Sequence, residues 1–250
     1  MKYTIISGTG RAGTTLLMRI LTRVGLDTGF STDDEIDEVA RAGLEQVINE
    51  SVRPANRIVK SPWLALTLEE ELAKGDFAVE HAIICMRDLR SAAESRRRVQ
   101  AESGEAGDVA GGLWMTRNPK RQDIVLAKIF YRLIYTLTVH EVPTTFMHFP
   151  RFAEDREYAI RMLSPIFPEV SRERWIEAFE AEVKPDLISV RPRARRRRLP
   201  PGEGALADHT AAGSTTRQQP AGRPRQSGRG SAAQRCGTRR GRSPRPRSWR

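Results

Sequence analysis

Short apolar runs recur along the first 150 positions, and each one is followed by a turn and then by a stretch with helical periodicity. Four of these runs are predicted to be strands, at residues 3–6, 57–60, 81–86 and 142–149. The run from His81 to Met86 is continuously apolar after its first residue, which is typical of a strand buried on both faces. The pattern therefore favours a parallel sheet.

Apolar residues spaced three and four positions apart predict helices between and after these strands. The first helix begins near Thr14 and ends at Gly25, and its apolar positions share one face: Leu16, Leu17, Ile20, Leu21 and Val24. Further helices are predicted at residues 36–50, 64–74, 89–100, 123–139, 151–163 and 171–182. Strands that alternate with helices imply right-handed crossovers. The predicted fold class is α/β, a P-loop-type three-layer sandwich with a parallel central sheet of about four to five strands.

The first strand runs directly into a glycine-rich turn, Gly8-Thr9-Gly10-Arg11-Ala12-Gly13, and the first helix follows it. Glycines let the backbone adopt positive φ, and the helix N-terminus supplies unpaired N–H groups and the positive end of its dipole. We therefore expect the turn to bind an anion; the alternative is a βα turn that binds nothing. The spacing from Gly8 to Gly13 matches a Walker A loop, but Thr14 stands where nucleotide kinases carry lysine, and the cation is Arg11.

Two more basic residues follow predicted strands. Lys60 ends the second strand, and Arg87 comes directly after the third. Ligands of parallel α/β sheets bind beyond the carboxyl ends of the strands, so Arg11, Lys60 and Arg87 are expected to converge on one crevice. The alternatives are an exposed strand-end lysine at position 60 and, for Arg87, pairing with Asp88 or with a helix terminus.

Charge is distributed unevenly along the chain. Residues 191–250 contain 17 arginines and no lysine against Glu203 and Asp208, a net charge of +15, which leaves residues 1–190 at −4. This segment has few large apolar residues and no periodicity, so it cannot offset the entropy of ordering itself. We expect a folded domain at 1–190 and a disordered tail rich in Arg, Pro and Gly at 191–250. One hypothesis for the missing lysines is a shifted reading frame, in which case the tail is not the ancestral C-terminus.

The two cysteines, Cys85 in a predicted strand and Cys236 in the tail, suggest neither a disulfide framework nor a metal site. The N-terminus has no hydrophobic signal core. The most apolar segment, 124–139, contains Lys128 and Arg132 and is too short to cross a bilayer. We expect a soluble, cytoplasmic protein without a membrane span.

Two motifs resemble those of sulfotransferases that use 3′-phosphoadenylyl sulfate (PAPS). Gly10-Arg11-Ala12-Gly13-Thr14-Thr15 resembles their 5′-phosphosulfate loop, in which a basic and a small residue precede Gly-Thr-Thr. Arg87 and Ser95 resemble their 3′-phosphate motif, in which a strand-end arginine is followed eight residues later by a serine on the next helix. The strand and turn at 142–155 also look like a later part of that domain. The resemblance covers about residues 1–185.

The resemblance implies an enzyme that transfers a sulfonate group from PAPS to a hydroxyl or amine of a carbohydrate or small-molecule acceptor, releases PAP and needs no metal. It implies that residues 10–15 hold the 5′ end of PAPS and that Arg87 and Ser95 hold the 3′-phosphate. Arg11 would contact the bridging oxygen in place of the family's loop lysine. Lys60 would reach the sulfonate, so Arg11 and Lys60 are the catalytic candidates.

The sequence departs from the family at the general base and at the C-terminus. Pro62 stands where many cytosolic members carry a histidine base. Other groups that could act as the base are Asp33, Asp34 and Glu35, or less favourably His81 and His140. The alternatives are a solvated turn for the acidic residues and a capping or packing role for the histidines. The family's C-terminal glycine-rich loop has no counterpart here. Trp114, in a polar loop at 103–119, could stack on an acceptor ring or simply pack against the domain.

Two other functions compete with sulfonate transfer. A P-loop nucleotide-dependent phosphotransferase would use the loop, but it would explain neither Thr14 in place of lysine nor the pair of Arg87 and Ser95. A nucleic-acid-binding protein would act through the tail, whose charge predicts salt-dependent, non-specific affinity for polyanions. Trp249 is the only aromatic residue of the tail, which disfavours a base-stacking surface. The acceptor and the oligomeric state stay open.

Overall fold

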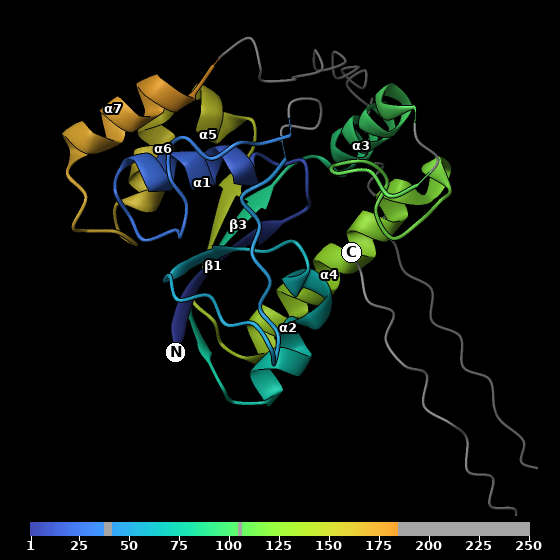
Figure 1. Ribbon diagram of the computed structural model, residues 1–250, viewed down its shortest axis with the longest axis horizontal. Coiled ribbons are helices and arrows are strands. Elements are labelled where there is room, and N and C mark those ends of the chain that lie inside the picture. The colour runs from blue at the N-terminus through green and yellow to red at the C-terminus, as the bar shows by residue number, and fades with distance from the viewer. Residues whose placement is uncertain (38–41, 105–106, 185–250) are drawn as a thin grey trace, which may run out of the picture. The chain divides into compact units, whose positions relative to one another are not determined.

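The computed structural model describes residues 1–37, 42–104 and 107–184 (Figure 1). Its strands are β1 (Lys2–Gly8), β2 (Ile58–Lys60), β3 (Ala78–Met86) and β4 (Thr144–His148). Its helices are α1 (Thr14–Arg23), α2 (Leu64–Ala73), α3 (Leu89–Ser103), the short 3-10 helix η1 (Pro119–Arg121), α4 (Gln122–Val139), α5 (Arg151–Glu154), α6 (Arg156–Leu163) and α7 (Arg172–Glu182). The predicted domain boundary at 190 and the predicted disordered tail at 191–250 lie outside the described residues.

The described strands form one four-stranded sheet in the order β2-β1-β3-β4, and every neighbouring pair is parallel. This confirms the predicted α/β fold class and the parallel central sheet. In register, Ile6 of β1 lies opposite Lys60 of β2, and Gly8 lies opposite Cys85 of β3. The carboxyl ends of β1, β2 and β3 therefore meet at one edge of the sheet.

The path of the chain changes direction at that edge. The chain leaves β1 towards β2 through α1, returns past β1 to β3 through α2, and continues to β4 through α3 and α4. Right-handed crossovers that run in opposite directions place their helices on opposite faces of the sheet. The connections that follow the adjacent strands β1 and β3 therefore leave the sheet in opposite directions, which makes the carboxyl ends of these two strands a topological switch point. In open α/β sheets, ligands bind at such points.

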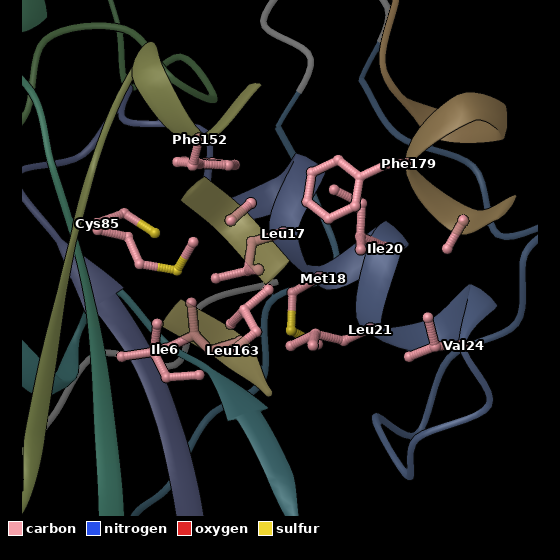
Figure 2. Packing of buried hydrophobic residues seen from close by; sticks show 14 of the residues in the cluster. Ile6, Leu17, Met18, Ile20, Leu21, Val24, Cys85, Phe152, Leu163 and Phe179 are labelled. Carbon is pink, nitrogen blue, oxygen red and sulfur yellow. The ribbon is translucent and has the colours of Figure 1, made fainter. Parts of the chain in front are cut away.

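One core lies between the sheet and helices α1, α5, α6 and α7 (Figures 1 and 2). Ile6 and Cys85 project into it from the strands, and the amphipathic face of α1 covers them through Leu17, Met18 and Leu21. Helix α7 packs on the outside of α1. An ion-pair cluster also joins the two helices, because Glu182 lies 2.6 Å from Arg19 and 2.5 Å from Arg23.

A second core lies on the opposite face of the sheet, under α2 and α4. Successive side chains of a strand point to opposite faces, so Ile5 and Ile84 enter this core while their neighbours Ile6 and Cys85 enter the first. Leu68 of α2 and Leu133 of α4 are both about 1% exposed within it. No helix in the described part of the chain is long and apolar enough to cross a membrane.

Two helix predictions are wrong. The predicted helix at 36–50 is absent from its described residues, which are irregular apart from an isolated bridge and turn near Asn49. Gly43 and Leu44 have φ values of 142° and 59°, which no right-handed helix contains, and Gln46 N–H instead donates to the carbonyl of Lys60 beside β2 at 2.9 Å. The predicted helix at 151–163 is divided between α5 and α6 at Asp155, whose carboxylate caps α6.

Candidate functional site

The glycine-rich loop, residues 8–13, joins β1 to α1 at the switch point. Gly10, Arg11 and Gly13 have φ values of 69°, 54° and 78°, so three of its residues are left-handed. A Cβ on Gly8 would lie 2.0 Å from the carbonyl oxygen of Cys85, and a Cβ on Gly13 would lie 2.7 Å from the rings of Phe149 and Phe152. Glycine is therefore required by the neighbouring atoms as well as by the backbone conformation.

The loop leads into a helix end that no side chain caps. The N-cap residue of α1 is Gly13, which has no side-chain hydrogen bond to offer, and the first turn of α1 carries no acidic residue. By contrast, Asp88 caps α3 by accepting from the Ser91 N–H at 2.9 Å. Thr14, in the first turn of α1, faces the pocket described below. The N–H groups and the dipole of α1 thus suit an anion at the glycine-rich loop.

The structure brings the loop together with Arg87 and Ser95, which are far from it in sequence. The Arg87 Nη1 donates to the Arg11 carbonyl at 3.1 Å, and the Arg11 Nε donates to Ser95 Oγ at 3.2 Å. The Arg87 backbone N–H also donates to Thr9 Oγ1 at 3.3 Å. Burial lowers the pKa of the Arg87 guanidinium, and the charge of Arg98 lowers it further. Both predicted anion motifs therefore lie in one cluster.

A small pocket lies beside the loop, at the ends of β1 and β2. It is lined by Ile6, Ser7, Gly8, Gly10, Thr14, Lys60 and Pro62. The hydroxyl oxygens of Ser7 and Ser61 are buried and have no hydrogen-bond partner among the described residues. Buried polar atoms are nearly always paired, so these two orphaned hydroxyls suit the polar groups of a ligand.

Lys60 forms one wall of this pocket and is only 2% exposed, so the alternative of an exposed strand-end lysine is wrong. Its ammonium donates to Thr15 Oγ1 at 2.8 Å and to the Gly43 carbonyl, and it lies 3.3 Å from Glu45 Oε1. Burial lowers the pKa of Lys60, while the charge of Glu45 opposes that shift. Lys60 therefore holds residues 42–48 against α1 at the edge of the site.

The other predicted residues of the loop differ in whether their side chains can contact a ligand. Thr14 lines the pocket, whereas the Thr15 hydroxyl is already engaged by Lys60 and by the Gly43 carbonyl. The side chain of Ala12 is fully buried in the core under α1, so only the backbone of Ala12 can contact a ligand. Gly10 lines the pocket and lies against a buried arginine that the sequence did not single out.

That arginine is Arg96, on α3 directly after Ser95. It is 7% exposed, its Nη1 donates to the Gly112 carbonyl at 2.8 Å, and its guanidinium lies 5.3 Å from the ring centre of Trp114. Burial and the nearby charge of Arg11 lower the pKa of Arg96 to about 10. The sequence did not reveal Arg96 because α3 contains several arginines, and only its position next to Ser95 distinguished Arg96 from the others.

Glu45 is the second functional residue that the sequence did not reveal. It lies within the wrongly predicted helix, and the structure places its carboxylate against Lys60, with 40% of the side chain exposed. The other candidate bases lie elsewhere. His81 is in register with Thr4 and contacts Thr145, and His140 ends α4 ahead of β4, so both histidines are away from the carboxyl edge of the sheet. Asp34 accepts from the Ser31 N–H in an exposed turn.

Trp114 packs against the hydrophobic core under α2 and α4 and against Ala92, Ala93 and Leu126. Its ring packs edge-on against Trp63 with 6.0 Å between ring centres, and Trp63 follows the pocket residue Pro62. Gln122 fixes the backbone of Trp114 by accepting from its N–H at 2.8 Å and donating to its carbonyl at 3.2 Å. Trp63 is 47% exposed, so an apolar ring face is open next to the pocket.

None of the protein-family models, curated proteins or solved structures compared with this chain matches it. What the site can bind follows from its own chemistry. The uncapped helix end of α1, three guanidiniums and several hydroxyls share one edge of the sheet, which suits a ligand that carries more than one anionic group. No group of three or more His, Cys, Asp or Glu side chains within the described ranges is placed to hold a metal ion.

Proposed function

We propose that this chain is a PAPS-dependent sulfotransferase, built on a P-loop-type three-layer α/β domain, that transfers a sulfonate group to a hydroxyl or amine of a carbohydrate or small-molecule acceptor. The contact of Arg87 and Ser95 with Arg11 carries the proposal. A turn that binds only a 5′-phosphate group needs no second basic site, whereas PAPS carries a phosphosulfate at one end of its ribose and a phosphate on its 3′ oxygen.

The residues of the site fit such a ligand. The N-terminus of α1 and the Thr14 hydroxyl would hold the phosphosulfate, because they face the pocket beside the loop. Arg87 can offer two parallel N–H groups to the 3′-phosphate, and Ser95 can offer a hydroxyl. The orphaned hydroxyl of Ser7 adds one more polar group to the pocket. PAPS supplies the activated sulfonate, and PAP is released.

The transfer requires charge stabilisation and a proton acceptor. The acceptor oxygen or nitrogen bonds to sulfur, the bond from sulfur to the bridging oxygen breaks, and negative charge develops on that oxygen as PAP leaves. Arg11 stabilises this charge and does not donate a proton, because its guanidinium stays protonated. Lys60 lies in the pocket wall, where its charge also favours the departing oxygen.

Glu45 takes the proton that the acceptor loses. It is the carboxylate next to Lys60 at the pocket wall, and it is exposed enough for an acceptor to reach it. Asp33, Asp34 and Glu35 have no contact with Lys60 in the structure, and the two histidines are away from this edge. A carboxylate base in this position compensates for Pro62, which has no titratable group.

Calorimetric binding to the full chain tests the proposal, with PAP, ADP, 5′-AMP and ATP as ligands. ADP is the most informative comparator because it carries two phosphates, as PAP does, but has both at the 5′ position. We expect PAP to bind at least tenfold more tightly than ADP, and Arg87→Ala to abolish this preference, a change of about 1.4 kcal/mol or more. Arg57→Ala is the control, because Arg57 is exposed and pairs with Glu80.

The outcomes separate the competing functions. Tighter binding of ATP with Mg²⁺ than of PAP would replace the proposal with a nucleotide-dependent phosphotransferase. Equal binding of all four nucleotides that disappears in high salt would assign the affinity to non-specific charge, as expected of the basic tail. A preference for PAP that survives Arg87→Ala would contradict the assigned 3′-phosphate site.

A further inference from the structure

Arg96 is a buried cation that forms no ion pair with a carboxylate of the described residues. It is 7% exposed, and the charge of Glu45 acts on it, but the Glu45 carboxylate is paired with Lys60. Its Nε is buried and has no hydrogen-bond partner among those residues. Although burial lowers its pKa to about 10, the guanidinium is still protonated at neutral pH. A buried guanidinium without a direct ion pair is costly, and an anion bound against it would offset that cost.

The position of Arg96 indicates where that anion lies. A Cβ built on Gly10 would be 2.3 Å from the Arg96 Nη2, so the guanidinium rests directly on the glycine-rich loop. Arg11, from the same loop, lies close enough to lower the pKa of Arg96 further. Two like charges held near each other and near the uncapped end of α1 favour an anion between them over any arrangement without one.

Arg96 also connects the loop to a different part of the chain. Its Nη1 donates to the Gly112 carbonyl, and its guanidinium covers the ring of Trp114. The Gly112–Trp114 segment is further anchored by Gln100, whose side-chain oxygen accepts from the Leu113 N–H at 3.1 Å. A ligand that bonds to Arg96 would therefore contact the same side chain that holds the Gly112–Trp114 segment in place.

We propose that Arg96 is a third anion ligand of the glycine-rich loop, and that the bound anion pairs directly with this buried guanidinium, which no carboxylate of the described residues does. The same side chain holds the Gly112–Trp114 segment against the loop. The identity of the anion rests on the proposed function: in a sulfotransferase it is the phosphosulfate end of PAPS, because Gly10 belongs to the loop assigned to that end. The geometry of Arg96 itself requires only an anion with oxygen acceptors.

The test measures the affinity of the full chain for inorganic pyrophosphate and for PAP, together with the melting temperature of the free protein. Arg96→Met keeps an apolar side chain of similar length and removes the charge. Arg96→Lys keeps the charge but loses the planar set of N–H donors of the guanidinium. Arg97→Met is the matched control, because the neighbouring Arg97 also donates to a carbonyl, that of Pro119 at 2.7 Å, and pairs instead with Glu94.

We expect Arg96→Met to weaken pyrophosphate and PAP at least tenfold, and Arg96→Lys to weaken them less. The control should stay within twofold of the wild type. Arg96→Met should also lower the melting temperature of the free protein, because it removes the hydrogen bond to the Gly112 carbonyl and the contact with Trp114, so the affinities are compared well below the melting temperature of each variant. A side chain that serves packing alone would lower the melting temperature and leave the affinity unchanged.

The two proposals fail separately. Pyrophosphate affinity of folded Arg96→Met within twofold of the wild type, measured below the melting temperature of the variant, overturns the role of Arg96 even if PAP still binds through Arg87. Conversely, pyrophosphate binding that depends on Arg96, combined with no preference for PAP over ADP, supports Arg96 and overturns the sulfotransferase function.

Discussion

A methyl group added to the glycine-rich loop should displace Arg96, and the chain contains a matched control for this experiment. Gly10 and Gly104 have nearly identical φ values, +69° and +68°. A Cβ on Gly10 would lie 2.3 Å from the Arg96 Nη2, whereas a Cβ on Gly104 would meet nothing within 4 Å. The difference between Gly10→Ala and Gly104→Ala therefore isolates the contact with Arg96 from the backbone cost.

The expected magnitudes follow from these contacts. An alanine in the left-handed region costs about 1 kcal/mol at either position. At Gly10 the arginine must also move, which breaks its charged hydrogen bond to the Gly112 carbonyl, worth about 1.5 kcal/mol or more, and its contact with Trp114, worth about 1 kcal/mol. The displaced guanidinium regains water, which offsets part of this loss, so we expect about 2–3 kcal/mol for Gly10→Ala.

Urea unfolding followed by circular dichroism measures both variants, provided that the slope of the unfolding free energy against urea is unchanged. Repeating Gly10→Ala in an Arg96→Ala background removes the clash, so its cost should fall to that of Gly104→Ala, a coupling of about 1–2 kcal/mol. A cost for Gly10→Ala within about 0.5 kcal/mol of Gly104→Ala in the wild-type background would refute the close packing of Arg96 on the loop.

Two further predictions concern Glu45 and Glu182. Glu45→Gln should lower the rate of sulfonate transfer by about 10²–10⁴ and leave the PAP dissociation constant within about twofold, as for loss of a general base; an unchanged rate would exclude Glu45 as the base. Glu182→Gln should lower the unfolding free energy at pH 7 by about 2–3 kcal/mol, because it leaves Arg19 and Arg23 without their shared partner. Burial raises the pKa of Glu182, but the hydrogen bonds from both arginines outweigh burial and lower the pKa overall. The stabilisation by the Glu182 carboxylate is therefore fully present above the pKa of the unfolded chain, about 4.3, and is lost as the pH falls through the folded pKa. The unfolding free energies of the wild type and Glu182→Gln, measured with urea, should therefore converge in acid. A constant difference down to about pH 3 would contradict this assignment.

Local pattern was enough to predict most of the scaffold. The apolar run from His81 to Met86 and the spacing of Leu17 and Leu21 are consequences of burial, which acts on neighbouring positions with fixed periods. The same reasoning failed at residues 36–50, where the amino acids resemble those of a helix. There the backbone of Gln46 bonds to Lys60 beside β2, and the left-handed Gly43 and Leu44 exclude a helix.

The edge of the sheet that carries the site was also predictable, because a loop after β1 and an arginine after β3 must meet wherever parallel strands end together. The position of β1 between β2 and β3 was not predictable, since strand order depends on which strands pair and local pattern carries no information about pairing. The roles of Arg96 and Glu45 depend on that order. One of several arginines on α3 is buried against Gly10, and one of several acidic residues contacts Lys60, only because packing brings segments distant in sequence together.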